Sequence, residues 1–126
     1  MTEVLQNDEY ERRFAGVAKI YGEESFNHYE QSHVMVIGIG GVGSWAVEAL
    51  ARTGLGELTL VDMDVIAASN INRQLPAMTT TLGHEKIEVM AERCRAINPR
   101  IKINLIDDYL TADNIQDVLA NTPDLI

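Results

Sequence analysis

The stretch HVMVIGIGGVGS, residues 33–44, joins a short apolar run to a cluster of glycines. The run itself, residues 33–37, is rich in β-branched side chains and meets glycine at once, as a buried parallel strand would. From Val42 onward the residues favour a helix, because apolar side chains recur at spacings of three and four until Gly54. A strand, a glycine-rich turn and a helix in this order predict the first unit of an α/β fold.

The rest of the chain continues this alternation of strand and helix. Further strands are predicted at 58–61 and 101–106, with the beginning of a fourth at 124–126. Helices are predicted at 9–15, around 26–29, from 83 to 97 and from 111 to 119, with a loop at 67–74 that contains one helical turn. The order predicts a Rossmann-like, mostly parallel sheet with helices on both faces, preceded by N-terminal helices.

The glycines of the turn have the spacing of a phosphate-binding site. Gly38, Gly40 and Gly43 form the pattern G-x-G-x-x-G between a strand and a helix. Glycines at these positions permit a tight turn and let backbone N–H groups approach a phosphate. Asp62 ends the next predicted strand, where a carboxylate can accept hydrogen bonds from the hydroxyls of a ribose. Together these residues predict a site for an adenine nucleotide.

Three polar residues further along favour ATP over NAD. Asn70, Arg73 and Lys86 follow the second strand, and extra cations suit attack on an α-phosphate, where the charge of the departing pyrophosphate must be offset. Each has a simpler explanation. Lys86 could be a solvated side chain, and Arg73 could form a salt bridge with Asp62 or Asp64.

Other reactive or aromatic residues are expected to have structural roles. Cys94 shares an apolar helix stripe with Met90 and Ile97, which predicts a buried thiol rather than a nucleophile. Trp45 is expected to be part of the core rather than a platform for a base. The three histidines, His28, His33 and His84, are expected to be exposed.

Composition restricts the function further. The net charge of -9 disfavours a general nucleic-acid binder but not an ATP site, which needs only a few cations. Neither a basic, apolar leader nor a long apolar stretch occurs, so we expect a cytoplasmic protein without a membrane segment. We expect one nucleotide-binding domain over residues 1–126. Because the chain stops inside an apolar run, we expect this domain to be truncated at Ile126.

Four motifs, taken together, resemble those of a known family. Residues 38–44, 62–64, 69–74 and 83–86 are similar in order and spacing to the ThiF/MoeB/HesA family of ubiquitin-activating-type adenylating enzymes. Within that family, the flanking sequences RRFAG, IYGE and WAVEALARTG resemble the tRNA threonylcarbamoyladenosine dehydratase branch. The similarity extends over nearly the whole chain.

The resemblance implies a set of ATP contacts. The nucleotide would contact Gly38, Gly40, Gly41, Gly43, Asp62, Asn70, Arg73 and Lys86. Asp62 would hold the ribose, and Asn70, Arg73 and Lys86 would surround the phosphates. The groups that act in catalysis would be Arg73, Lys86 and an N-terminal arginine, Arg13 or its neighbour Arg12, which would reach the triphosphate of the partner subunit in a homodimer.

The resemblance also implies an activity, in which ATP activates the carboxyl group of threonylcarbamoyladenosine in tRNA and a ring closes with loss of water. ATP and Mg²⁺ would be the cofactors. The Mg²⁺ ligand is expected beyond Ile126, so no metal ligand is assigned in this chain, and the chain alone is expected to be inactive. Besides tRNA and a second subunit, a sulfur-carrier or cysteine-desulfurase protein is a candidate partner.

Three alternatives stay open. The first is an adenylyltransferase that activates the C-terminal glycine of a ubiquitin-like sulfur carrier. The second is a non-catalytic nucleotide-binding dimer module. An NAD-dependent oxidoreductase is the weakest alternative, because it gives Asn70, Arg73 and Lys86 no common purpose.

Overall fold

A parallel sheet of three strands forms the centre of the computed structural model, which describes residues 7–126, and side chains from residue 9 onward. The strands are β1 (His33–Ile37), β2 (Glu57–Val61) and β3 (Lys102–Ile106), in the spatial order β1-β2-β3. Their starts are in register, since His33 pairs with Glu57 and Glu57 pairs with Lys102. All three carboxyl ends therefore meet at one edge of the sheet, where α/β folds bind ligands.

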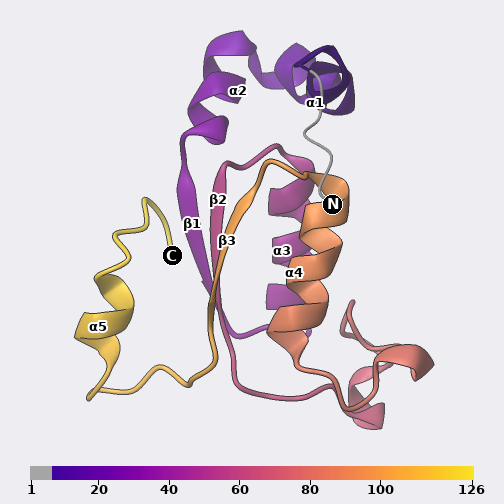
Figure 1. Cartoon of the computed structure of the whole chain (residues 1–126), viewed down its shortest axis with the longest axis vertical. Coiled ribbons are helices and arrows are strands. Elements are labelled where there is room, and N and C mark those ends of the chain that lie inside the picture. Colours follow the sequence, from indigo (N-terminus) through magenta and orange to yellow (C-terminus); the bar gives the residue numbers. More distant parts are fainter. Residues whose placement is uncertain (1–6) are drawn as a thin grey trace.

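Helices cover both faces of this sheet (Figure 1). The helices are α1 (Asn7–Tyr21), α2 (Glu23–Glu30), α3 (Gly43–Arg52), α4 (Lys86–Ile97) and α5 (Ile115–Leu119), with short 3₁₀ turns at Ala68–Asn70 and Thr79–Thr81. Helices α3 and α4 lie side by side on one face, and α5 lies on the other. The predicted α/β, Rossmann-like architecture is confirmed.

Alternate residues of β2 supply the two halves of the core. Leu58 and Leu60 are fully buried in the larger cluster, which packs against α3 and α4. Val61 points to the other face, where it packs with Met35 and with Val118 of α5. A central strand buried on both faces reads as a continuous apolar run, as the sequence of β2 does.

Helices α1 and α2 lie at the end of the sheet where the strands begin (Figure 1). Tyr10, Phe14 and Phe26 form their own aromatic cluster. Gly22 separates the helices with a φ of 92°, a left-handed conformation that glycine adopts without strain. The two N-terminal helices predicted at 9–15 and around 26–29 are therefore separate, and the site at the opposite edge of the sheet is left uncovered by them.

The last residues add to the free side of β1. Leu125 forms a parallel bridge with Val34, and its carbonyl oxygen accepts a hydrogen bond from the backbone N–H of Met35 at 2.9 Å. The carboxylate of Asp124 accepts another from the backbone N–H of His33 at 2.8 Å. This pairing agrees with the strand predicted to begin at 124–126.

The predicted starts of two helices are wrong. Helix α5 begins at Ile115 rather than at Thr111. Helix α4 begins at Lys86 rather than at Gly83. Gly83 has a φ of 85°, and its backbone N–H donates to the carbonyl oxygen of Ile66 at 2.8 Å. These contacts hold residues 83–85 beside the loop after β2, where Glu85 forms a bridge with Val65, and place Lys86 at the first turn of α4. Within residues 7–126, no helix has the length and apolar character needed to cross a membrane.

Candidate functional site

The glycine turn between β1 and α3 is fixed by close backbone contacts. Gly38 has a φ of 91°. A Cβ atom at Gly43 would overlap the carbonyl oxygen of Gly38, so no larger residue fits there. The buried hydroxyl of Ser44 donates to the carbonyl oxygen of Gly40 and accepts from the backbone N–H of Leu75 at 3.3 Å. The first turn of α3 is thus held open toward the carboxyl edge, as phosphate binding at a helix N-terminus requires.

Asp62 connects this turn to the end of β2. One oxygen of its buried carboxylate accepts from the backbone N–H of Ile39 at 2.7 Å, and the other accepts from the N–H of Asp64, also at 2.7 Å. The carboxylate therefore organises the turn before any ligand arrives. The structure adds this role to the ribose contact expected from the sequence, which stays a prediction.

Arg73 lies directly against the turn. A Cβ atom at Gly41 would be 3.4 Å from Cδ of Arg73, so the arginine stem packs on the glycine backbone. Its guanidinium donates to the carbonyl oxygen of Ser69 at 3.0 Å and to Oδ1 of Asn72 at 3.1 Å. Within residues 9–126, Arg73 forms no ion pair. The alternative of a salt bridge to Asp62 or Asp64 is wrong, and the positive charge faces the site uncompensated.

Trp45 is exposed, contrary to the expectation that it belongs to the core. The residue is 53% exposed, and Nε1 of its indole donates to the carbonyl oxygen of Arg73 at 2.9 Å. It thereby ties the loop that carries Arg73 to α3. Asn70 has a similar local role, because its Oδ1 accepts from the backbone N–H of Ala67 at 2.9 Å and begins the 3₁₀ turn.

Lys86 completes the charged part of the edge. Its residue is only 5% exposed, and its Nζ lies 3.9 Å from Oδ2 of Asp64. Tyr109, in the loop after β3, donates its hydroxyl to Oδ1 of Asp64 at 2.7 Å, and this hydrogen bond raises the pKa of Tyr109. The alternative of a solvated Lys86 is wrong, since the residue is buried and its ammonium group lies beside a carboxylate.

Asp64 and Tyr109 were missed as site residues by the sequence analysis. Asp64 stands two residues after Asp62, and Tyr109 is an aromatic residue shortly after the end of β3. Because the carboxyl ends of neighbouring parallel strands share an edge, polar and aromatic residues just past each strand were the available signal.

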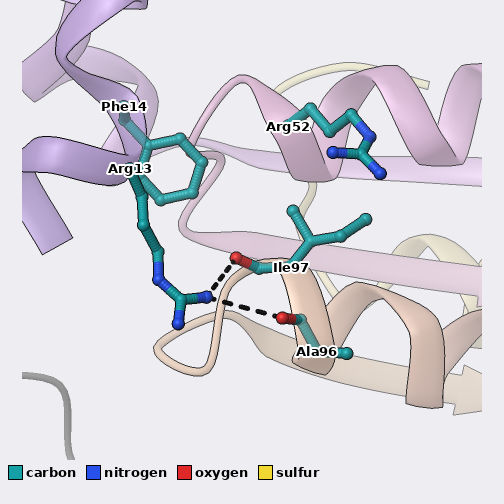
Figure 2. Close-up of a pocket in the computed structure, with 5 residues that line it drawn as sticks. All are labelled: Arg13, Phe14, Arg52, Ala96 and Ile97. Atoms are coloured by element: carbon teal, nitrogen blue, oxygen red, sulfur yellow. Dashed lines mark hydrogen bonds between the residues drawn. The ribbon is translucent and has the colours of Figure 1, made fainter. Parts of the chain in front are cut away.

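Arg13 is placed at the opposite end of the sheet. Figure 2 shows its guanidinium at the last turn of α4, where it donates to the carbonyl oxygens of Ile97 at 2.9 Å and Ala96 at 3.4 Å. With Phe14 and Arg52 these residues line a pocket of about 400 Å³. A cation at the carbonyl end of a helix is stabilising. The contacts support a structural role for Arg13 within one subunit.

Arg12, the other arginine considered, is exposed and forms no hydrogen bond or ion pair within the part of the chain that the structure describes. Neither arginine lies near the glycine turn of the same chain, because α1 and the turn are at opposite ends of the sheet (Figure 1). A contact with phosphate would need a second copy of the chain.

Cys94 is fully buried against the α3 face, as predicted. Burial in apolar surroundings raises its pKa to about 11, so the nucleophilic thiolate is absent near neutral pH. His28 and His84 are exposed as expected, but His33 is buried, with its Nε2 2.6 Å from Oγ1 of Thr59. No group of three His, Cys, Asp or Glu residues among residues 9–126 could hold a metal ion.

Comparisons with known proteins agree with this geometry. The model of the ThiF family matches residues 10–126. The tRNA threonylcarbamoyladenosine dehydratase of Haemophilus influenzae is 52% identical over 126 residues, which is 100% of this chain and 48% of that protein. A solved structure of the E. coli enzyme of that name in complex with ATP has a TM-score of 0.91 and 46% identity, over 95% of this chain and 49% of that one.

A more distant relative, the molybdopterin-synthase adenylyltransferase of E. coli, is 39% identical over 91 residues, or 72% of this chain and 36% of that protein. The chain therefore spans about half the length of the curated dehydratase relative that it matches in full.

Proposed function

The chain belongs to the ThiF family, and on that premise we propose that it is the ATP-binding part of an enzyme that activates the carboxylate of threonylcarbamoyladenosine in tRNA for dehydration and ring closure. The observation that carries this proposal is a continuous series of contacts at the carboxyl edge. Asp62 bonds to Ile39 of the turn, Arg73 packs on Gly41, and Lys86 lies beside Asp64. The identity of 52% to a dehydratase supports the choice of substrate.

Different residues at the carboxyl edge of the sheet bind different parts of ATP. The backbone N–H groups of the turn at Gly40, Gly41 and Gly43 hold phosphate oxygens. The N–H of Gly38 donates to the carbonyl oxygen of Val61 at 2.8 Å, so Gly38 contributes the shape of the turn instead. Asp62 receives a ribose hydroxyl on the lone pairs that its two backbone contacts leave free. Arg73 and Lys86 neutralise the charge that develops on the departing pyrophosphate, and Asn70 orients the loop between them. Arg12 from a second copy of the chain adds a further cation, since Arg13 is occupied at α4.

The proposed chemistry has two steps. In the first, a carboxylate oxygen of the substrate attacks the α-phosphorus, the bond to the bridging oxygen of the β-phosphate breaks, and pyrophosphate leaves. In the second, the N6 nitrogen of the adenosine, which carries the carbamoyl group, attacks the activated carbonyl carbon, loses its proton and expels AMP, which closes a five-membered ring. The substrate loses one water overall, and its oxygen departs with AMP. Orientation and charge stabilisation suffice for both steps.

Mg²⁺ is implied by the resemblance, but no donor set among residues 9–126 matches it. Both oxygens of Asp62 accept backbone N–H groups, and those of Asp64 face Tyr109 and Lys86. These contacts compete with a metal for the same oxygens, so no step is assigned to a metal ion held by these residues.

Titration calorimetry tests the nucleotide assignment. We expect the chain to bind ATP in preference to NAD, and Arg73→Ala to lower the ATP affinity about tenfold or more. Arg95→Ala, an exposed arginine on α4, is the matched control and should bind as the unaltered chain does. A preference for NAD, or equal affinities of the two variants, would contradict the proposal.

The choice of substrate needs the longer protein and a separate test. When its gene is deleted, mass spectrometry should show tRNA in which threonylcarbamoyladenosine is no longer cyclised. If the protein instead activates the C-terminal glycine of a sulfur carrier, the tRNA should be unchanged and the carrier should lack its thiocarboxylate. This alternative is favoured by the similarity to the molybdopterin-synthase adenylyltransferase.

A further inference from the structure

Gln74 carries a buried amide group with an unusual lack of partners. The residue is only 6% exposed, and its Oε1 is buried without a hydrogen-bond partner among residues 9–126. Its Nε2 lies 3.9 Å from the position that a Cβ atom of Gly40 would occupy. The side chain is therefore directed at the glycine turn, and one end of its amide has nothing to bond in the free protein.

Contacts on either side fix Gln74 in this position. Its backbone N–H donates to the carbonyl oxygen of Asn70 at 2.9 Å. The preceding carbonyl, of Arg73, accepts from Trp45, and the following N–H, of Leu75, donates to Ser44. The unpaired amide is thus held by the same loop that holds Arg73 against the turn. An unsatisfied buried acceptor is destabilising, and an apolar side chain of similar size would avoid that cost.

The triphosphate that the turn would hold cannot supply the missing partner, because its oxygens are acceptors at neutral pH and an amide oxygen needs a donor. The ribose hydroxyls of ATP are assigned to Asp62 in the proposed site. We therefore look to the second substrate for the donor. A carboxamide presents a donor and an acceptor side by side, and a half-turn about its last bond exchanges them. It fits a ligand group that offers an N–H next to an oxygen.

We propose that the carboxamide of Gln74 binds the second substrate as an acylamino carboxylate, accepting from the N–H beside the carboxylate and donating to a carboxylate oxygen. The inference rests on the proposed function and deepens it. Both candidate substrates have this group, because threonylcarbamoyladenosine and a C-terminal glycine each carry an N–H on the carbon that bears the carboxylate. The second carboxylate oxygen then faces the α-phosphate on the turn. Gln74 is a substrate-binding residue that the sequence analysis did not identify.

The test compares ligands that differ only in that N–H. The chain is saturated with an ATP analogue that has a methylene group between the α- and β-phosphates. Titration calorimetry then measures the affinity for a peptide that ends in glycine and for the same peptide ending in N-methylglycine. A second arm uses the nucleoside threonylcarbamoyladenosine and its form methylated on the threonine nitrogen. The variants are Gln74→Met and, as a matched control, Gln116→Met on the exposed side of α5.

In one of the two arms, we expect the unaltered chain and Gln116→Met to bind the N–H ligand about tenfold more tightly than the methylated one. Gln74→Met should reduce this ratio to near one and leave the affinity for the nucleotide analogue unchanged. Its Tm without ligand should rise by about 3 °C, because the unpaired acceptor is gone. The arm that responds identifies the source of the carboxylate.

Three outcomes overturn the inference. They are an unchanged ratio in Gln74→Met, a lower Tm of that variant with the ratio retained, and no binding of either carboxylate by the nucleotide-saturated chain. Failure of the proposed function differs from all of these, because the chain would then not bind the ATP analogue at all, whatever residue stands at position 74.

Discussion

The contact between α3 and α4 and the carboxyl edge of the sheet hold their charged residues in different ways. Between the helices, Glu48 is only 8% exposed. Its carboxylate accepts hydrogen bonds from Arg52 at 3.1 Å and from Arg93 at 2.5 Å. Here opposite charges neutralise one another. At the carboxyl edge, Asp62 accepts backbone N–H groups and Arg73 donates to a backbone carbonyl and a neutral amide.

This difference indicates which charges are available to a ligand. An arginine paired with a buried carboxylate must lose that partner before it can bind a phosphate, and the loss is costly. An arginine held by neutral groups keeps its full charge for the ligand. The two regions are connected, since α4 carries Lys86 at its first turn and Arg93 near its last.

Two glycines provide the strongest test of the comparison. A Cβ atom at Gly43 would overlap the carbonyl oxygen of Gly38, and one at Gly56 would overlap that of Glu30. We expect Gly43→Ala and Gly56→Ala each to lower the free energy of unfolding by about 3 kcal/mol or more, because backbone must move. Urea unfolding measures this loss.

The two variants should differ in ATP binding. Measured well below the unfolding midpoint, Gly43→Ala should abolish binding, because the turn itself is displaced. Gly56→Ala should bind ATP normally in its folded fraction, since Gly56 lies at the end of the sheet where β2 begins. Equal ATP affinities in the two folded variants would show that the turn is not the binding site.

The titration of Cys94 tests whether the core between the helices excludes water, as its burial indicates. Its pKa is raised by burial from 9.0 to about 11. As pH rises past 9, the unfolded chain loses the thiol proton while the folded chain keeps it. The free energy of unfolding is therefore at its full value below pH 9 and falls as pH rises to about 11. We expect a loss of about 2 kcal/mol across that window.

Urea unfolding near pH 8 and at about pH 10.5 measures this loss. Cys94→Ala is the comparison, because it removes the titrating group while leaving every other ionisable residue in place. Its stability should be lower near pH 8 through the lost packing but should fall less with pH. Parallel pH profiles of the two proteins would show that Cys94 is not desolvated.

Arg73 and Arg13 form the matched pair of arginines. Arg73→Ala should weaken ATP binding about tenfold, or about 1.4 kcal/mol, with little change in stability, since its guanidinium contacts are exposed. Arg13→Ala should lower the free energy of unfolding by about 1 kcal/mol, because the last carbonyls of α4 lose their donor. Calorimetry measures the ATP affinity of both variants, and urea unfolding measures their stability. If Arg13→Ala weakened ATP binding and Arg73→Ala lowered the stability, Arg13 would be the binding residue and Arg73 the structural one.

Much of the fold could be predicted because it depends on local patterns. The strand 33–37 and the helix after Gly43 follow from apolar periodicity and from the glycine turn between them. The convergence of Asp62, Arg73 and Lys86 could also be foreseen, because strands in parallel order bring their carboxyl ends to one edge.

The errors arose where contacts join residues distant in sequence. Trp45 occupies an apolar helix position, yet the carbonyl of Arg73, 28 residues away, draws its indole to the surface. Gln74 and Tyr109 were overlooked for the same reason, since burial beside Gly40 and a bond to Asp64 leave no local pattern. His33 reads as exposed in sequence and is buried by its neighbour Thr59 on β2.

Tyr109 offers the mildest test of the carboxyl edge. The residue is 53% exposed, and its only role in the proposed site is to hold the carboxylate of Asp64 beside Lys86. Tyr109→Phe removes that hydrogen bond and keeps the ring, so Asp64 should turn more fully toward the Lys86 ammonium group and reduce its charge toward phosphate. We expect ATP affinity to fall about twofold to threefold, with stability unchanged, because the hydrogen bond is exposed to water and contributes little to folding. Tyr21→Phe, an exposed tyrosine on α1 at the far end of the sheet, is the control. If both variants bind ATP equally well, the Asp64 carboxylate does not modulate Lys86, and the charged edge reduces to the turn, Arg73 and Lys86 alone.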